Sequence, residues 1–241
     1  MRNEELENRA LTAARSEPRV GLHFRPDFLD LDAQGTLTVE AEVDNVAQKR
    51  LALERMAAVP GVSGIIDRIR VRPAAPMSDD GIMDHLRKRF GEDATFENLT
   101  LKEMRLGRLE PVRDAVGKPA GTIELEVQDG VVILNGQAPS LASKRLAGVL
   151  AWWIPGVRDV INGMAVEPPE EDAPILIEEA VKLALEQDPL LDASQIRVGV
   201  RHGVVRLTGL VKSEHARGLA EADAWYVFGV DDVINEIEVH A

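Results

Sequence analysis

The sequence predicts an α+β protein made of three tandem α-β-β-α-β units, each a three-stranded mixed sheet with two helices on one face. Three observations predict this fold class. A repeat runs through the chain in register, each repeat contains a glycine-bearing hairpin turn, and each hairpin is followed by a helical segment and a closing strand. Self-similarity of this kind indicates repeated structural units.

The repeat aligns on one glycine per unit, and a second glycine follows each of these twenty-six residues later. The first set is Gly35, Gly130 and Gly203, and the second is Gly61, Gly156 and Gly229. Each unit closes on a valine thirty-six residues after its first glycine: Val71, Val166 and Val239. No alignment gap is needed, so chance is a poor explanation for the match.

The hairpins are predicted from Asp129-Gly130 and His202-Gly203, which lie between apolar runs that alternate with a period of two. Glycine adopts the positive φ of a two-residue hairpin turn at no steric cost. The predicted strands are 124–128 and 131–135 in the second unit, and 196–200 and 204–208 in the third.

A helix is predicted after each hairpin, over 141–154 and 214–226, with Ser140 and Ser213 as N-caps. Glycine ends the helix of every unit, at Gly61, Gly156 and Gly229, and proline precedes the first two of these glycines. The closing strands are predicted over 65–71, 160–166 and 233–239. Because a helical crossover precedes each one, we expect it to lie parallel to a strand of its hairpin.

A second amphipathic helix is predicted ahead of each hairpin, over 4–15, 82–90 and 175–186. Proline-rich linkers occupy 73–76 and 167–174. The predicted domains are therefore 1–72, 78–167 and 174–241. The middle domain is longer than the others, and we interpret 91–121 as an insertion with some strand content.

The motifs of the second unit resemble those of the BON domain family. They are DGVVILNG at 129–136 and IPGVRDVIN at 154–162. The third unit matches nearly as well. The first is the most diverged: Ala41 stands where the other units have a second hairpin glycine, and Asp67 stands where they have an asparagine. The glycines are Gly136 and Gly209, and the asparagines are Asn162 and Asn235.

The resemblance implies a non-catalytic binding or scaffolding protein of envelope and osmotic stress. Its expected partner is a phospholipid surface or another protein. The alternative implied by the same resemblance is a cytoplasmic sensor that responds to potassium or another ion, with a monovalent cation as the ligand.

Composition limits the possible partners. The net charge is −13, from 41 acidic and 28 basic residues, which argues against nucleic acid and weakens any model based on overall attraction to anionic lipid. No apolar run is long enough to be a transmembrane segment. The N-terminus lacks the apolar core of a signal peptide, so we expect a cytoplasmic location, or a periplasmic one if the sequence is a trimmed mature form.

No enzyme, metal site or cofactor is predicted. The chain has no cysteine, and its five histidines are scattered without a metal-binding spacing. Ser213 and His215 are close in sequence, but Ser213 occupies the expected helix cap, and no nucleophile elbow is present.

The candidate binding residues are four aromatics in matching repeat positions: Trp152, Trp153, Trp225 and Tyr226. Asp223 is hard to bury, so we expect the helix core to include Ala220 and Ala224 instead, with the aromatics at its rim. The first unit has alanines in these positions, so the fold does not require aromatics. They either pack within the chain, at the core edge or between units, or form an exposed patch for lipid headgroups or a protein.

Overall fold

The structure, a computed structural model, describes residues 2–240. It divides into two compact units, Met1–Arg72 and Pro73–Ala241. From here on, the first unit is Met1–Arg72, with the first repeat, and the second unit is Pro73–Ala241, with the other two repeats. The α+β class and the mixed sheets predicted from the repeat are confirmed.

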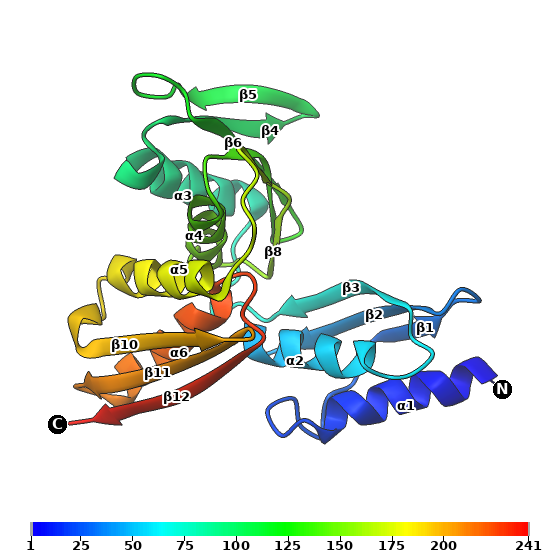
Figure 1. Ribbon diagram of the computed structural model, residues 1–241. Coiled ribbons are helices and arrows are strands. Elements are labelled where there is room, and N and C mark those ends of the chain that lie inside the picture. The colour runs from blue at the N-terminus through cyan, green and yellow to red at the C-terminus, as the bar shows by residue number, and fades with distance from the viewer. Residues whose placement is uncertain (1, 241) are drawn as a thin grey trace. The chain divides into compact units, whose positions relative to one another are not determined.

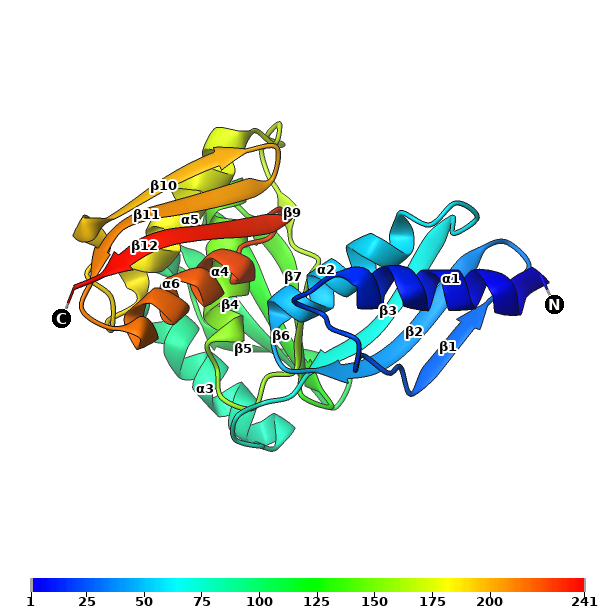
Figure 2. The same ribbon diagram turned by 90° about the horizontal axis from the view of Figure 1, so that it is seen from below.

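The first unit contains two helices and one three-stranded sheet. Its elements are α1 (Arg2–Ser16), β1 (Phe28–Leu31), β2 (Thr36–Val43), α2 (Val46–Ala57) and β3 (Gly64–Val71). In the sheet, β2 is central, antiparallel to β1 and parallel to β3. Helices α1 and α2 lie side by side over one face (Figures 1 and 2). Alternate residues of β2 are buried under them, among them Leu37 and Val39.

The second unit begins with what we call the middle module, which extends from α3 to β9. Its elements are α3 (Asp79–Glu92), the 3-10 turn Ala94–Phe96, β4 (Leu99–Arg105), β5 (Arg108–Arg113), β6 (Gly121–Gln128), β7 (Val131–Ala138), α4 (Leu141–Trp152), β8 (Asp159–Asn162) and β9 (Ala165–Val166). The strand order is β5-β4-β6-β7-β8, and β9 also pairs with β7. The segment interpreted as an insertion therefore adds β4 and β5 to the edge of the repeat's sheet (Figure 1).

The C-terminal module extends from α5 to β12. Its elements are α5 (Pro174–Gln187), the 3-10 turn Ala193–Gln195, β10 (Ile196–Arg201), β11 (Val204–Val211), α6 (Glu214–Tyr226) and β12 (Asp232–Val239). The order β10-β11-β12, with an antiparallel hairpin and a parallel third strand, is the same as in the first unit.

Local signals in the sequence placed the turns and helix starts correctly. Asp129 and His202 have φ of 53° and 49°, and the glycine after each is also at positive φ, as a two-residue hairpin turn requires. Ser140 and Ser213 accept hydrogen bonds from the backbone N–H three residues later, so both are N-caps.

The closing strand of the middle module differs from the prediction. We expected one strand over 160–166, whereas β8 ends at Asn162 and β9 resumes at Ala165. The break falls at Gly163, where the C-terminal module has Glu236. Glycine in a strand interior has no side chain to pack and loses more conformational freedom, so the strand is weakest there.

One repeated polar residue ties each closing strand to its helix. Asn162 Nδ2 donates to Lys144 O at 2.7 Å, and Asn235 Nδ2 donates to Arg217 O at 3.0 Å. The first unit has Asp67 in this place, which cannot donate. There Lys49, at the same repeat position as Lys144 and Arg217, lies 2.9 Å from Asp67 through its Nζ. An ion pair thus replaces the amide hydrogen bond.

Candidate functional site

The helix faces of the middle and C-terminal modules pack against each other. Every residue of α4 from Arg145 to Ala151 is buried, although the middle sheet covers only one side of this helix. Helix α5 lies against both α4 and α6 and packs on β10 (Figure 1). The second unit is therefore a pair of modules joined through their helices.

The four candidate aromatics lie at this junction. The ring of Trp152 stacks on that of Tyr226, with centroids 5.7 Å apart and planes 13° apart. The indole N–H of Trp153 donates to Asp223 Oδ1 at 2.8 Å. Trp225 is only 2% exposed. The contacts of Trp152, Trp153 and Tyr226 therefore join the end of α4 to the end of α6.

Two expectations about this region are wrong. Asp223 is buried, at 2% exposure, and Trp225 belongs to the core instead of the rim. For Asp223 the reason is that the neighbouring module supplies Trp153 as a hydrogen-bond donor to its buried carboxyl. The binding role of the four aromatics stays a prediction. A ligand could reach Trp225 only if the packing around α6 opened.

The environment of Asp223 strongly perturbs its titration. Burial raises the pKa of Asp223 to about 7, the hydrogen bond from Trp153 opposes this rise, and the neighbouring carboxyl of Asp188 adds to it. Asp188 is the C-cap residue of α5 and is itself buried. Asp223 Oδ2 has no hydrogen-bond donor among the described residues. Burial and then the charge of Asp223 raise the pKa of Tyr226.

Arg145 is a second contact between the modules, and sequence reasoning missed it. Its guanidinium is fully buried. Nε donates to Phe228 O at 2.9 Å, and Nη2 donates to both carboxylate oxygens of Asp172, at 2.7 and 2.6 Å. The available signal was that α4 has no charged or hydroxyl side chain after Arg145, from Leu146 to Trp152, which indicates that this half of the helix is covered all round. An arginine in such a helix must find buried partners.

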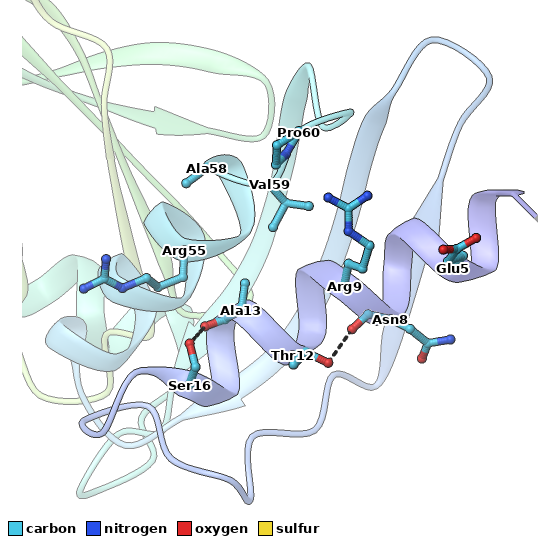
Figure 3. Close-up of a pocket in the computed structure, with 10 residues that line it drawn as sticks. All are labelled: Glu5, Asn8, Arg9, Thr12, Ala13, Ser16, Arg55, Ala58, Val59 and Pro60. Carbon is cyan, nitrogen blue, oxygen red and sulfur yellow. Dashed lines mark hydrogen bonds between the residues drawn. The ribbon is translucent and has the colours of Figure 1, made fainter.

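The first unit has a groove where its two helices meet. Figure 3 shows it between α1 and the end of α2, with the Arg9 guanidinium reaching across it towards Val59 and Pro60. Ala58, which lines the groove, occupies the repeat position of Trp153 and Tyr226. The small side chains of Ala13 and Ala58 leave this surface hollow.

An isoleucine recurs on the sheet face opposite the helices. Ile66, Ile161 and Ile234 occupy the same repeat position and are 47%, 48% and 36% exposed. Their neighbours along the strand point to the helix side, as the alternation of a β-strand requires. The first unit, the middle module and the C-terminal module therefore each present one partly exposed isoleucine on the sheet face away from their helices.

Two further observations concern the described residues alone. Between residues 2 and 240, no helix is long and apolar enough to cross a membrane. Within the same range, no group of three or more His, Asp or Glu side chains is arranged to hold a metal ion.

Comparison with known proteins identifies a family. The model of the BON domain matches residues 111–168 and 176–241, which together cover slightly more than half of the chain. These matches fall on the middle and C-terminal modules, where the sequence motifs are clearest.

Comparison with solved structures adds little. Two structures of CdsD, a structural protein of the type III secretion system of Chlamydia trachomatis, are similar at 14% identity and cover 98% of this chain. The match with the C-terminal domain covers 98% of that chain with a TM-score of 0.24, and the other covers 92% with a TM-score of 0.25. Scores this low carry no argument about fold or function. No curated protein matches the chain.

Proposed function

The chain belongs to the BON domain family, and we propose that it is a non-catalytic binding and scaffolding protein. The observation that carries this proposal is the junction between the middle and C-terminal modules. There a stacked aromatic pair, an indole–carboxylate hydrogen bond and a buried arginine hold two modules as one body. Two modules joined in this way can hold ligands in a fixed arrangement on their sheet faces, where Ile161 and Ile234 are partly exposed.

The ligand we propose is a phospholipid surface or a protein partner in the response to envelope or osmotic stress. The isoleucines of the sheet faces support a binding role, because each repeat offers one partly exposed apolar side chain at the same position, and a partner that covers them would bury apolar surface. The groove of the first unit is a further concave surface of the kind that binds a side chain of a partner.

The proposed location is the cytoplasm, with the periplasm as the alternative for a trimmed mature form. Fractionation of the source organism, with detection of the native chain in cytoplasmic, periplasmic and membrane fractions, tests this directly. Recovery in the periplasmic fraction would contradict the cytoplasmic proposal.

Deletion of the gene and complementation test the function. The deletion strain should grow poorly after a hyperosmotic shift or in detergent, and the intact chain should restore growth. A variant with Trp152→Ala and Tyr226→Ala should restore growth only partly, because it loosens the junction. The control is Phe228→Ala, which removes an aromatic ring that is 61% exposed. Normal growth of the deletion strain, or full rescue by the double variant, would count against the proposal.

A further inference from the structure

The hairpin of β4 and β5 projects beyond its sheet. Strand β4 pairs with β6 only over Leu99–Glu103, while its pairing with β5 continues to Arg105 and Arg108. The residues from Met104 to Leu109 therefore form a tip without a neighbouring strand on the β6 side (Figure 1). This tip lies in the segment that the repeat does not require.

The turn at the tip contains an unusual residue. Leu106 has φ of 49° and Gly107 has φ of 75°. The two other hairpin turns of the second unit place Asp129 and His202 in the same conformation. Short polar residues adopt this left-handed region far more readily than leucine. Leu106 is also 97% exposed, so no burial within the chain compensates for the strain.

The residues that flank the turn break a second local rule. Arg105 and Arg108 are direct cross-strand partners, and both are exposed. Like charges opposite each other destabilise a hairpin. Leu109, the next residue, is 42% exposed. A leucine at positive φ and two facing arginines therefore occur at the same turn. Locally unfavourable residues of this kind are expected where function requires them.

We propose that this tip, Arg105–Leu109, docks on the surface of an anionic lipid bilayer. The proposal rests on the proposed binding function and names one surface and one partner for it. Phosphate groups would relieve the repulsion between the two arginines, and the region between headgroups and acyl chains would accept Leu106. Strand addition by a partner is disfavoured, because Pro111 on the edge strand β5 has no N–H to donate.

The charge of the whole chain limits the contact to the tip but does not prevent it. Residues 99–120 carry five basic and three acidic side chains in a chain of net charge −13. At physiological ionic strength charges are screened over about 8 Å, so a projecting tip acts largely by its own charge. Asp80 and Asp84 of α3 line a groove with Arg105 and offset part of its charge, so the bilayer contact falls mainly on Leu106 and the exposed Arg108.

Vesicle flotation with the full chain tests the proposal. Vesicles of phosphatidylcholine alone are compared with vesicles that also contain phosphatidylglycerol, at low and high salt. The intact chain should float only with the anionic vesicles, and less at high salt. Leu106→Asn should weaken this binding about tenfold, because the variant has no leucine side chain to enter the apolar region of the bilayer. Arg108→Gln should weaken it about fivefold, and Arg105→Gln should weaken it less, because acidic side chains line the same groove as Arg105.

Matched controls separate the tip from general effects. Leu190→Asn changes another exposed leucine, and Arg201→Gln changes an exposed arginine beside the hairpin turn of the C-terminal module. Neither should alter flotation. Asparagine suits the left-handed turn, so Leu106→Asn should leave the melting temperature unchanged or raise it, and lost binding cannot then be attributed to unfolding.

The outcomes distinguish the inference from the function on which it rests. Equal flotation of the intact chain and Leu106→Asn would overturn the role of the tip and leave membrane binding by another surface. No flotation with either vesicle would overturn the lipid partner, leaving a protein with an acidic, apolar pocket as the candidate. The growth test of the deletion strain is independent of both results.

Discussion

Asp223 is the residue whose chemistry depends most on the contact between modules. It is a carboxylic acid at 2% exposure, with the carboxyl of Asp188 beside it and the indole of Trp153 as its donor. Buried carboxyls in such surroundings hold their proton to higher pH than in water. The junction therefore contains a group that titrates close to neutral pH.

We expect this group to make the second unit less stable as the pH rises towards 7. The pKa of Asp223 is about 7 in the folded chain and 3.8 for the ordinary group. Its contribution is thus fully present below pH 3.8 and is lost as the pH rises through 7, by up to about 4 kcal/mol. Asp223→Asn should remove this dependence and be the more stable form at pH 8.

Urea unfolding at pH 5 and pH 8, followed by tryptophan fluorescence, measures the effect. The comparison between the intact chain and Asp223→Asn cancels the contributions of other titrating groups, including those that are more exposed. A difference between the two proteins that is the same at both pH values would show that Asp223 titrates normally.

At the scale of elements, the second glycine of each hairpin motif shows how closely neighbouring backbone approaches a strand. Gly136 and Gly209 have φ of 104° and 130°, and a Cβ there would lie 2.2 and 2.0 Å from the carbonyl oxygens of Thr122 and Gln195. The first unit has Ala41 in this place. Its strand β1 begins at Phe28, which pairs with Glu40, so β1 does not extend to a partner for Ala41. The divergence from glycine is therefore explained.

Gly209→Ala should lower the free energy of unfolding by about 3 kcal/mol, because the backbone of the neighbouring strand must move. The matched control is Gly199→Ala in the same sheet, where a Cβ would meet nothing within 4 Å. This control should change stability by less than about 0.5 kcal/mol. Chemical denaturation of both variants measures the difference, and equal losses would refute the steric explanation.

At the scale of the whole molecule, the two linkers differ in how they are held. Leu141 N donates to Glu170 at 2.8 Å, and Arg145 binds Asp172, so the linker between the middle and C-terminal modules is tied to α4. The linker after the first unit separates two compact units and contains exposed residues at 74–76. Exposed segments with small residues are the preferred sites of proteolysis.

Limited proteolysis of the native chain should therefore cut first near residues 73–76 and release a fragment that contains both later modules. Arg145→Met should expose the second linker to cleavage and lower the stability of the second unit by about 2 kcal/mol, because charged hydrogen bonds are lost. Mass spectrometry identifies the fragments. Early cleavage of the intact chain at 167–174 would contradict the inference that the linker between the middle and C-terminal modules is held against α4.

The sequence by itself determined the parts of the fold that depend on local chemistry. Hairpin turns need residues that adopt positive φ, helix starts need a side-chain acceptor, and alternating apolar residues define one face of each strand. These signals repeat in register, so the element order and the parallel closing strands could be predicted. The family motif follows from the same residues, because it describes turns and helix ends.

Only the tertiary structure decided how the repeated helices meet. The sequence places Trp152, Trp153 and Asp223 on predicted helices, but the contacts of both tryptophans and the burial of Asp223 depend on a second module from elsewhere in the chain. Packing between modules involves contacts such as Trp153 with Asp223, seventy residues apart, and no local periodicity specifies them. For the same physical reason the sequence could not name Phe228 and Asp172 as the partners of Arg145 or place Leu106 at a projecting tip.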